Sequence, residues 1–437
     1  MTDTRIRRID ARRVWDSRGR PTVEAEITLH DGSVGRAIVP AGASTGTREA
    51  LELRDGGPAF GGLDVQRALG HVRGEIATAL AGRDAADQAA LDRCLVELDG
   101  TPAKTRLGAN ATLAVSLAAA HAAAASAGLP LYRYLEGSPA TTLPLPLPLP
   151  LPQIQIFGGG AHAGRRVDVQ DFMVVCPGAR SFAQALEWTA EVYRSAGRLM
   201  QRRGALHGVA DEGGWWPDFD SNEQALQALL QAIEEAGYVP GEQVAIALDV
   251  AASEFGRGGR YRLGLEGREL DADGLIEMLL RWTERYPIVS IEDPLAEDDL
   301  QGFARFTRAV GRRLQVVGDD LLVSHATLLR EAAAAGAANC ILLKPNQRGT
   351  LSETRAAWQA ARELGYAGIV SARSGESEDT SIVHLAIGWG VGQLKVGSFA
   401  RSERMAKWNE VLRIEEQLGA DARFAGAAVL GRNPRRG

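Results

Sequence analysis

Six short apolar segments in the second half of the chain each end in a charged residue that could do chemistry. They span residues 244–249, 288–292, 314–319, 340–344, 368–373 and 392–395, and they end in Asp249, Glu292, Asp319, Lys344, Arg373 and Lys395. Carboxylate oxygens from three separate segments are ligands that Mg²⁺ prefers. A lysine close to other cations can have a lowered pKa and act as a base. The combination predicts removal of a proton next to a substrate carboxylate, with a metal ion that stabilises the enolate-like charge.

The same six segments have the length and composition of β-strands. Segments of helical composition lie between them, such as residues 321–336 and 350–365. A strand and helix repeat of this kind builds a parallel sheet that is buried on both faces. Closed into a (β/α)₈ barrel, the sheet brings the carboxyl end of every strand to one rim, where barrel enzymes hold their catalytic groups. One charged residue at a strand end can be a solvated cap, but six in succession favour a site.

Length and composition restrict the class of protein. The 437 residues suggest a barrel-sized domain with a second domain, and the net charge of -6 argues against a general nucleic-acid binder. Three cysteines, an odd number without metal-ligand spacing, suit reduced thiols. The start of the chain lacks a signal peptide, and the Ala-rich segment 112–127 is shorter than a membrane span. We expect a cytoplasmic protein that binds neither nucleic acid nor membrane.

The chain divides into two domains and a connection. Residues 1–138 begin with an alternating antiparallel meander and continue with helical segments, which predicts an α+β domain. Residues 139–152 include an alternating Leu-Pro tract. We interpret it as an extended connection into the first barrel strand, and a polyproline ligand for a partner protein is the alternative. Residues 153–437 form the predicted barrel domain.

Loops outside the six segments carry further polar candidates. The loop at residues 41–46 contains Ser44 and is small and glycine-rich, so its backbone could hold a phosphate or a metal, or it could be a plain mobile loop. His162 lies among small residues and could bind a carboxylate, although a lone loop histidine is more often solvated. The polar face of the strand that follows carries one or more of three residues, depending on the register, namely Asp168, Gln170 and Asp171.

Nine motifs, taken in order along the chain, resemble those of the enolase family. They are Asp16-Ser-Arg-Gly-Arg-Pro-Thr-Val-Glu24, Gly42-Ala-Ser-Thr-Gly46, Leu107-Gly-Ala-Asn110, Asp211-Glu-Gly-Gly214, Ser290-Ile-Glu-Asp-Pro294, Gly318-Asp-Asp-Leu321, Asn346-Gln347 with Gly349-Thr-Leu-Ser352, Arg373-Ser-Gly-Glu376 and Ala400-Arg-Ser-Glu-Arg404. One such motif is moderate support, but this ordered set covers almost the whole chain. The resemblance implies the enolase fold, in which an N-terminal α+β capping domain precedes a (β/α)₈ TIM barrel.

The resemblance also implies Mg²⁺ as the cofactor and a lysine as the base, a pattern established for the enolase superfamily. The tighter ion would be held by Asp249, Glu292 and Asp319. A second ion would bind with the substrate phosphate, under a lid formed by the loop of Ser44. Lys344 resembles the base that removes the proton alpha to the substrate carboxylate.

The remaining matched residues would bind a small anionic, phosphorylated three-carbon acid. Glu212 resembles the acid that helps the leaving hydroxyl to depart, and Lys395 resembles the cation that faces the substrate carboxylate. Asp171 stands at a position where enolases carry a catalytic glutamate, and we count it among the catalytic residues. Arg373 and Ser374 match residues that contact the phosphate. His162 and Gln170 match polar groups of the pocket wall.

The chain departs from the family pattern close to the implied chemistry. Ala372 stands where enolases carry a histidine before the phosphate arginine, and Asp171 is one methylene shorter than the glutamate it replaces. Loss of a buried, hydrogen-bonding histidine is expected to lower the rate of an enolase about ten- to a thousandfold. The pair Trp215-Trp216 is either core packing or the wall of a pocket. Further departures are Phe157, Pro345 and Gly397-Ser-Phe-Ala-Arg401.

Three functions compete. We favour a specialised paralogue of the carboxyphosphonoenolpyruvate synthase type from phosphonate antibiotic biosynthesis, because the departures gather at the chemistry. Such an enzyme would be a lyase or a phosphonoformyl transferase, with a phosphonate substrate and a nucleotide-conjugated donor. The alternative is an ordinary glycolytic enolase that dehydrates 2-phosphoglycerate to phosphoenolpyruvate. The third and weakest hypothesis is a non-catalytic scaffold. By resemblance, Glu24 and Arg413 pair across the contact of a homodimer or a larger ring.

Overall fold

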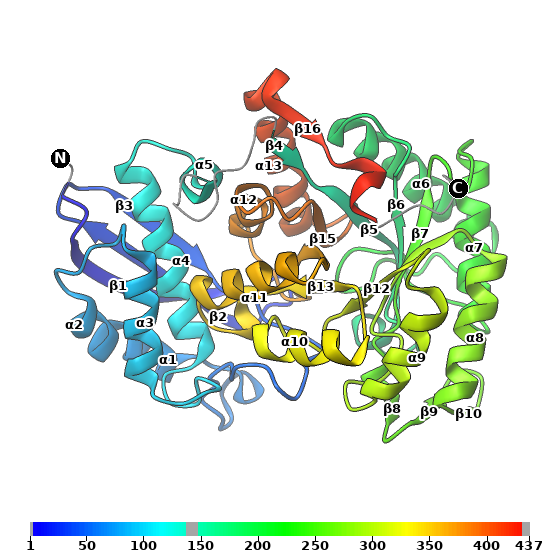
Figure 1. Cartoon of the computed structure of the whole chain (residues 1–437), viewed down its shortest axis with the longest axis horizontal. Helices are drawn as coiled ribbons and strands as arrows, with labels where there is room; N and C mark the ends of the chain where they lie inside the picture. The colour runs from blue at the N-terminus through cyan, green and yellow to red at the C-terminus, as the bar shows by residue number, and fades with distance from the viewer. Residues whose placement is uncertain (1–2, 137–146, 431–437) are drawn as a thin grey trace.

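The computed structural model describes residues 3–136 and 147–430, which form an α+β domain beside a barrel domain (Figure 1). The predicted fold class is confirmed. The predicted boundary at residue 138, the first part of the Leu-Pro connection and the tail after residue 430 lie outside the described residues. None of the helices in the described ranges has both the length and the apolar character that a membrane span requires.

The N-terminal domain is an antiparallel sheet covered by helices. The strands, in the spatial order β1-β2-β3, are β1 (Ile6–Trp15), β2 (Pro21–Leu29) and β3 (Val34–Ile38). The helices are α1 (Gln66–His71), α2 (Ala77–Leu80), α3 (Gln88–Asp99), α4 (Ala109–Ser126) and α5 (Leu131–Glu136). The Ala-rich α4 packs very closely on the sheet, because a Cβ atom at Gly35 would lie 2.1 Å from the carbonyl oxygen of Ala118. This helix is therefore a core element, as its composition predicts.

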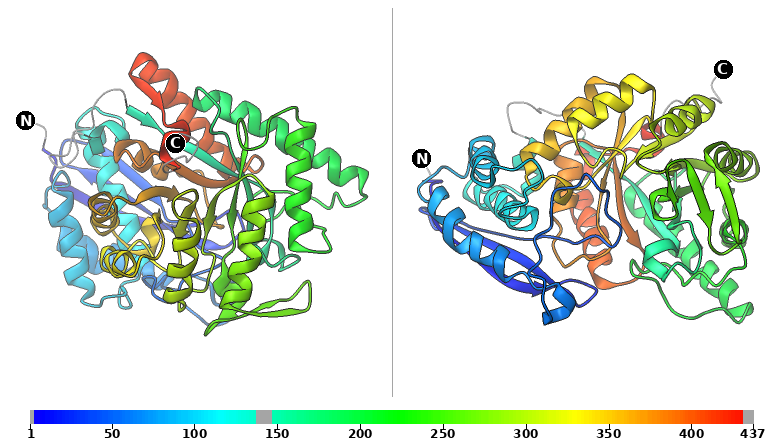
Figure 2. Two further views of the ribbon diagram at one scale, coloured as in Figure 1. Left: turned by 45° about the vertical axis from the view of Figure 1, so that its right-hand side comes forward. Right: turned by 90° about the horizontal axis from the view of Figure 1, so that it is seen from below.

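The second domain is a closed barrel with the strand order β11-β12-β13-β14-β15-β5-β6-β7. Its strands are β5 (Leu151–Gly158), β6 (Asp171–Val175), β7 (Ala245–Asp249), β11 (Ile288–Glu292), β12 (Gln315–Gly318), β13 (Cys340–Leu343), β14 (Ala367–Ser371) and β15 (Gln393–Ser398). The helices lie around its outside (Figure 2); they are α6 (Phe182–Arg202), α7 (Asn222–Glu235), α8 (Ala272–Arg285), α9 (Leu300–Val310), α10 (Ala326–Ala335), α11 (Leu351–Glu363), α12 (Ser381–Gly388) and α13 (Ser402–Leu418).

One strand of the barrel runs against the others, which corrects the expectation of a wholly parallel sheet. β6 is antiparallel to both β5 and β7. The reason is the connection: β5 and β6 are joined by the loop 159–170, which contains a short 3₁₀ turn in place of a crossover helix. The reversal brings the first residue of β6, Asp171, to the same rim as the last residue of β7, and the two are register partners.

Small strand pairs complete the fold. The described part of the Leu-Pro tract includes β4 (Leu147–Leu149), which pairs in parallel with β16 (Ala422–Phe424). This pairing agrees with an extended connection. After β7, a separate antiparallel sheet contains β8 (Gly256–Arg257), β9 (Arg260–Leu263) and β10 (Arg268–Asp271).

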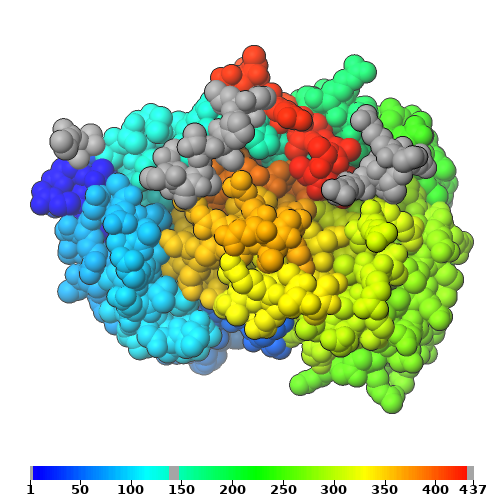
Figure 3. Space-filling model, in the orientation of Figure 1, coloured from blue at the N-terminus to red at the C-terminus, as the bar shows by residue number. Residues whose placement is uncertain are grey.

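The N-terminal domain caps a barrel helix near the candidate site. The backbone N–H of Leu351 donates to Ser116 Oγ at 3.0 Å, and that of Ser352 donates to Asp92 Oδ2 at 2.8 Å. Both donors belong to the first turn of α11, whose N–H groups lack partners within the helix. The surface is continuous across this contact (Figure 3). The two domains are therefore joined close to Lys344, which precedes α11.

Candidate active site

The charged ends of the barrel strands meet at one rim, as the sequence predicts. Ten of the twelve predicted site residues line a single cavity there: Ser44, His162, Gln170, Asp171, Glu212, Asp249, Lys344, Arg373, Ser374 and Lys395. The other two, Glu292 and Asp319, are buried and bond to the lysines of the cavity. The cavity therefore collects charged and hydrogen-bonding groups from seven barrel elements and the loop of Ser44.

Ion pairs link the carboxylates to the two lysines. Lys395 Nζ lies 2.8 Å from Asp249 Oδ2, 2.8 Å from Glu292 Oε2 and 3.1 Å from Asp171 Oδ2. Lys344 Nζ forms an ion pair with Asp319 Oδ2. Each lysine is buried, so these interactions act in a region of low dielectric constant. Three of the carboxylates are thus held around the ammonium group of Lys395, and the fourth is held by that of Lys344.

The pKa of Lys344 differs from the expectation. Burial is the largest influence and would lower the pKa of this ammonium, but the nearby carboxylates, Asp319 first and then Glu292, together outweigh burial and the neighbouring cations, and the pKa is raised. The expected lowering by neighbouring cations is therefore wrong for this arrangement, because the closest charge is negative. Burial also opposes the charge of Lys395, but its three carboxylates raise the pKa well above the ordinary value. Both lysines are protonated at neutral pH here.

The residues at this rim fit a divalent cation. Glu292 Oε1 is buried and has no hydrogen-bond partner among the described residues. Burial and the nearby Asp249 carboxylate raise the pKa of Glu292 well above its usual range, which indicates that a further positive charge would be favourable there. Gln170 and Gln347 orient two of the carboxylates, with Nε2 atoms 3.1 Å from Asp249 Oδ2 and 2.8 Å from Asp319 Oδ1. Asp249, Glu292 and Asp319 could hold Mg²⁺ with this support.

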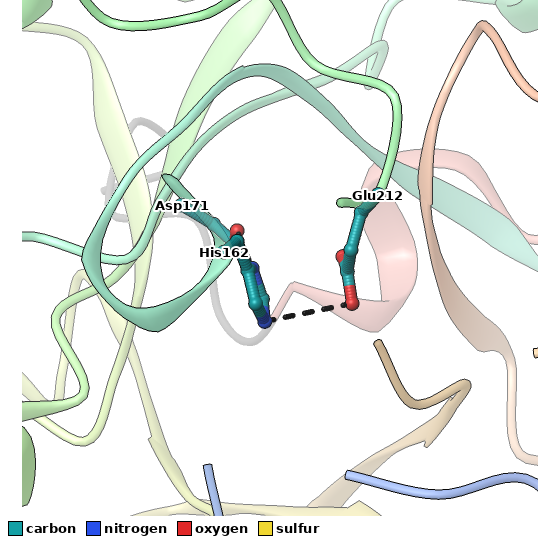
Figure 4. A group of neighbouring side chains, drawn as sticks. All are labelled: His162, Asp171 and Glu212. Carbon is teal, nitrogen blue, oxygen red and sulfur yellow. Dashed lines mark hydrogen bonds and ion pairs between the residues drawn. The ribbon is translucent and has the colours of Figure 1, made fainter. Parts of the chain in front are cut away.

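A histidine of the cavity interacts with two acids, Asp171 and Glu212 (Figure 4). His162 Nδ1 is 3.1 Å from Asp171 Oδ1, and Nε2 is 3.7 Å from Glu212 Oε1. Burial lowers the pKa of the imidazole, but Glu212 and Asp171 outweigh burial and the pKa is raised. Because its two ring nitrogens face different carboxylates, His162 is better placed to pass a proton than to bind a metal together with both acids.

Gln155 is a buried contact of this group that the sequence reasoning missed. Its Nε2 donates to Asp171 Oδ1, and its Oε1 accepts a hydrogen bond of 2.9 Å from the backbone N–H of Gly214. The available signal was Gln153 and Gln155 at alternate positions of an otherwise apolar strand, which places two amides on the same face. Buried amides without an obvious partner in sequence indicate a specific hydrogen-bond network.

The loop of Ser44 lies against the predicted phosphate contacts. Arg373 Nη2 donates to the carbonyl oxygen of Ser44 at 2.9 Å, and the backbone N–H of Ala43 donates to Ser374 Oγ at 2.6 Å. Glu49, which follows the loop and was also missed, accepts a hydrogen bond of 2.9 Å from Arg373 Nη1. The guanidinium that is predicted to bind phosphate therefore already donates to a carboxylate and to the backbone of the loop.

Of the residues that depart from the family pattern, some line the cavity and others pack in the core behind it. Ala372 lines the cavity and offers only a methyl group there. Trp215 does not line it: the indole stacks on Tyr193 with the ring centroids 4.7 Å apart, and Nε1 donates to the Tyr193 carbonyl oxygen at 2.9 Å. Phe157 is fully buried and contacts Phe219 edge to face. The open question about Trp215 is thus answered in favour of packing, directly behind the turn that carries Glu212.

Comparison with known proteins identifies the family. Residues 6–135 match the family model of the enolase N-terminal domain, and residues 146–432 match that of the enolase C-terminal TIM barrel domain. "Enolase 1" of Desulfitobacterium hafniense (strain Y51) is 48% identical over 433 residues, which cover 98% of this chain and 98% of that protein. With the barrel, the capping domain and the charged rim in place, the chain belongs to the enolase family.

Proposed function

We propose that this protein is an ordinary enolase, a carbon–oxygen lyase that dehydrates 2-phosphoglycerate to phosphoenolpyruvate with Mg²⁺. The observation that carries the proposal is the 48% identity to "Enolase 1" along 98% of both chains. The comparisons give no support to a synthase of carboxyphosphonoenolpyruvate, a phosphonoformyl transfer or a nucleotide-conjugated donor. Ala372 and Asp171 remain the features that favour such a paralogue, and both lie at the cavity.

Different residues of the cavity would bind the substrate and remove its proton. Lys395 would bind the substrate carboxylate, and Arg373, Ser374 and Ser44 would bind the phosphate. Lys344 would take the proton from the carbon next to the carboxylate. It can do so only after it is separated from Asp319, because that carboxylate raises its pKa. When bound at Asp249, Glu292 and Asp319, Mg²⁺ would supply positive charge that stabilises the enolate-like transition state.

The acids around His162 would serve the second half of the reaction. Glu212 would give a proton to the leaving hydroxyl, and His162, 3.7 Å away, would be the nearest source of a replacement proton. Asp171 would hold the imidazole through Nδ1. Burial of all three groups excludes water, so that a proton stays within the set.

The deciding experiment is an assay of the purified protein with Mg²⁺ and 2-phosphoglycerate alone, followed by the ultraviolet absorbance of phosphoenolpyruvate. We expect a kcat of about 1–1,000 s⁻¹, the ordinary range of enzymes. A rate a thousandfold below that range, in a protein that is folded and binds Mg²⁺, would reject the proposal and favour the paralogue. Omission of the metal is the matched control.

We also propose a cytoplasmic homodimer. Within the chain, Glu24 Oε2 lies 3.5 Å from Arg36 Nε, and the exposed Arg413 pairs with Glu410 at 2.8 Å. Arg413 is exposed, whereas Glu24 is buried and also pairs with Arg12. Light scattering should give twice the monomer mass, and Arg413→Glu should shift the protein toward monomer. A monomeric wild-type protein at micromolar concentration would reject this part of the proposal.

A further inference from the structure

Gln155 connects the two acids of the candidate site without lining its cavity. The side chain is fully buried in β5. One end of its amide donates to Asp171 Oδ1, and the other end accepts from the backbone N–H of Gly214 at 2.9 Å. Gly214 belongs to the turn that carries Glu212. A single side chain therefore spans the distance between one acid and the backbone that supports the other.

The backbone around the amide leaves space for it. A Cβ atom at Gly214 would lie 2.4 Å from Gln155 Oε1, and a Cβ atom at Gly158 would lie 3.2 Å from the same oxygen. Glycine at both positions therefore permits the close approach of the amide. The turn is also tied to β15, because the Ser398 backbone N–H donates to the Glu212 carbonyl oxygen at 2.9 Å and Ser398 Oγ donates to that of Gln155. These bonds fix the acidic turn against β5.

The position of Asp171 controls that of His162. Three side chains surround the short carboxylate: Gln155 Nε2 and His162 Nδ1 are hydrogen-bonded to Oδ1, the histidine at 3.1 Å, and Lys395 Nζ forms an ion pair with Oδ2 at 3.1 Å. Two of them, His162 and Lys395, also reach other carboxylates of the cavity. Gln155 is the one uncharged side chain among these three, and it connects Asp171 to the backbone of the Glu212 turn. Loss of this connection would free Asp171 to turn toward the lysine and away from the imidazole.

We propose that Gln155 is a positioning residue, which holds Asp171 and the Glu212 turn at a fixed separation with His162 between the two carboxylates. The inference rests on the proposed dehydration, in which Glu212 protonates the leaving hydroxyl. A displacement of about 1 Å in a catalytic group lowers a rate about a hundredfold. Removal of the amide should therefore lower kcat, while binding of the product acid, which depends on Arg373 and Lys395, is kept.

The test compares Gln155→Met with Gln153→Met. Both replacements keep the length of a buried side chain in β5 and remove its hydrogen bonds, but Gln153 Nε2 donates to Gln393 Oε1 at 3.2 Å, away from the acids. We expect Q155M to lower kcat about 30- to 100-fold and to bind phosphoenolpyruvate with Mg²⁺ within about threefold of wild type by calorimetry. Q153M should change both values by less than about threefold. Equal kcat values for the two variants, or a parallel loss of kcat and binding in Q155M, would overturn the inference.

Two further measurements keep the test decisive. If Q155M does not fold, Gln155→Glu retains the acceptor for Gly214 but places an oxygen against Asp171, and an unchanged kcat in Q155E would overturn the inference. Crystal structures of the variants test the same inference without an activity assay. In Q155M or Q155E, Asp171 or the turn of residues 210–214 should be displaced from its position in Q153M. Unchanged positions would overturn the inference. A wild-type protein without turnover would instead reject the proposed function, so the two failures are distinguishable.

Discussion

The two sides of the cavity are built on different physical principles. We define the lysine side as Asp249, Glu292, Asp319, Lys344 and Lys395. Each comes from a separate barrel strand: the first four stand at its last residue or directly after it, whereas Lys395 lies within β15. Opposite charges hold these groups in place. On the histidine side, defined as His162, Asp171, Glu212 and Gln155, two acids share one imidazole, and neutral amide and backbone groups hold them. The Lys395–Asp171 contact of 3.1 Å joins the sides.

Departures from the family pattern adjoin both sides: Pro345 directly follows Lys344, and the Ala372 backbone N–H donates to the Lys395 carbonyl oxygen at 2.8 Å. Among the residues that form the two sides, however, they are distributed unequally. Asp171 belongs to the histidine side, and Trp215 and Phe157 pack behind its acidic turn and strand. The lysine side retains all five of its expected residues. Metal binding and proton removal impose strict geometry on charged groups, whereas a proton donor can be supported by several neutral arrangements. Ordinary dehydration and a specialised reaction would therefore share the lysine side and differ on the histidine side.

The largest effect is expected at Lys344. Lys344→Met removes the proposed base while preserving side-chain length, and it should lower kcat about 10³- to 10⁴-fold. Lys104→Met is the control, because Lys104 is equally buried but pairs with Glu353 at 3.0 Å, outside the cavity. K104M should keep kcat within about threefold in the folded protein. If kcat of K344M fell by less than tenfold, Lys344 would not be the base, and the lysine side would not be the site of proton removal.

Metal removal is the next test of the lysine side. Chelation should lower the rate by more than about a hundredfold, and added Mg²⁺ should restore it. A ligand that binds only the folded protein also raises its melting temperature, so Mg²⁺ at a hundred times its Kd should stabilise the wild type by about 2.7 kcal/mol. Glu292→Gln should abolish this stabilisation. If E292Q responded to Mg²⁺ as the wild type does, the ion would bind elsewhere.

Much of the lysine side could be predicted from sequence, because parallel strands place their last residues at one rim. Asp249, Glu292 and Lys344 needed only correct strand ends, and those lay within one or two residues of the observed bounds. The direction of the pKa shift of Lys344 could not be predicted, because it depends on whether the carboxylate of Asp319 or the guanidinium of Arg373 lies closer to the ammonium. Sequence order contains no such distances.

Less of the histidine side could be predicted. Alternation of apolar residues does not reveal strand direction, so the reversal of β6 was missed. Asp171 was assigned to the site through the family resemblance and not through its place at the start of a reversed strand. Gln155 resembles any polar residue in a strand until its partners are known. The direction of Trp215 depends on the close approach of α6, where a Cβ atom at Gly197 would lie 2.7 Å from the indole. These features come from packing between distant segments.

A medium effect is expected on the histidine side. Asp171→Asn keeps the shape of the side chain but removes its charge, so that His162 Nδ1 and Lys395 lose a carboxylate. We expect kcat to fall about a hundredfold and KM to change by less than about threefold. Asp168→Asn is the control, because Asp168 accepts from the Gly264 backbone N–H at 2.7 Å, outside the cavity. A rise in KM with kcat unchanged would assign Asp171 to substrate binding instead.

The smallest effect on activity is expected for a buried histidine outside the cavity, His384. Its pH dependence separates a loss of activity on the histidine side from a loss of the fold. His384 lies in α12 and stacks on Tyr132 of the N-terminal domain. Burial, followed by the nearby His121, lowers its pKa from 6.5 to about 4, although Glu410 opposes the shift. The unfolded chain therefore binds more protons between these pH values, and stability that is present above about pH 6.5 is lost as the pH falls toward 4.

This loss should amount to about 3 kcal/mol, by the usual conversion of a pKa shift. Chemical denaturation of His384→Gln should show a flatter dependence of the free energy of unfolding on pH in that window than that of the wild type. The acidic limb of the kcat profile should be the same in H384Q and in the wild type if it reports the histidine side. A limb that moved with H384Q would instead report unfolding at the domain contact, and the acid chemistry would then have to be measured above pH 6.5.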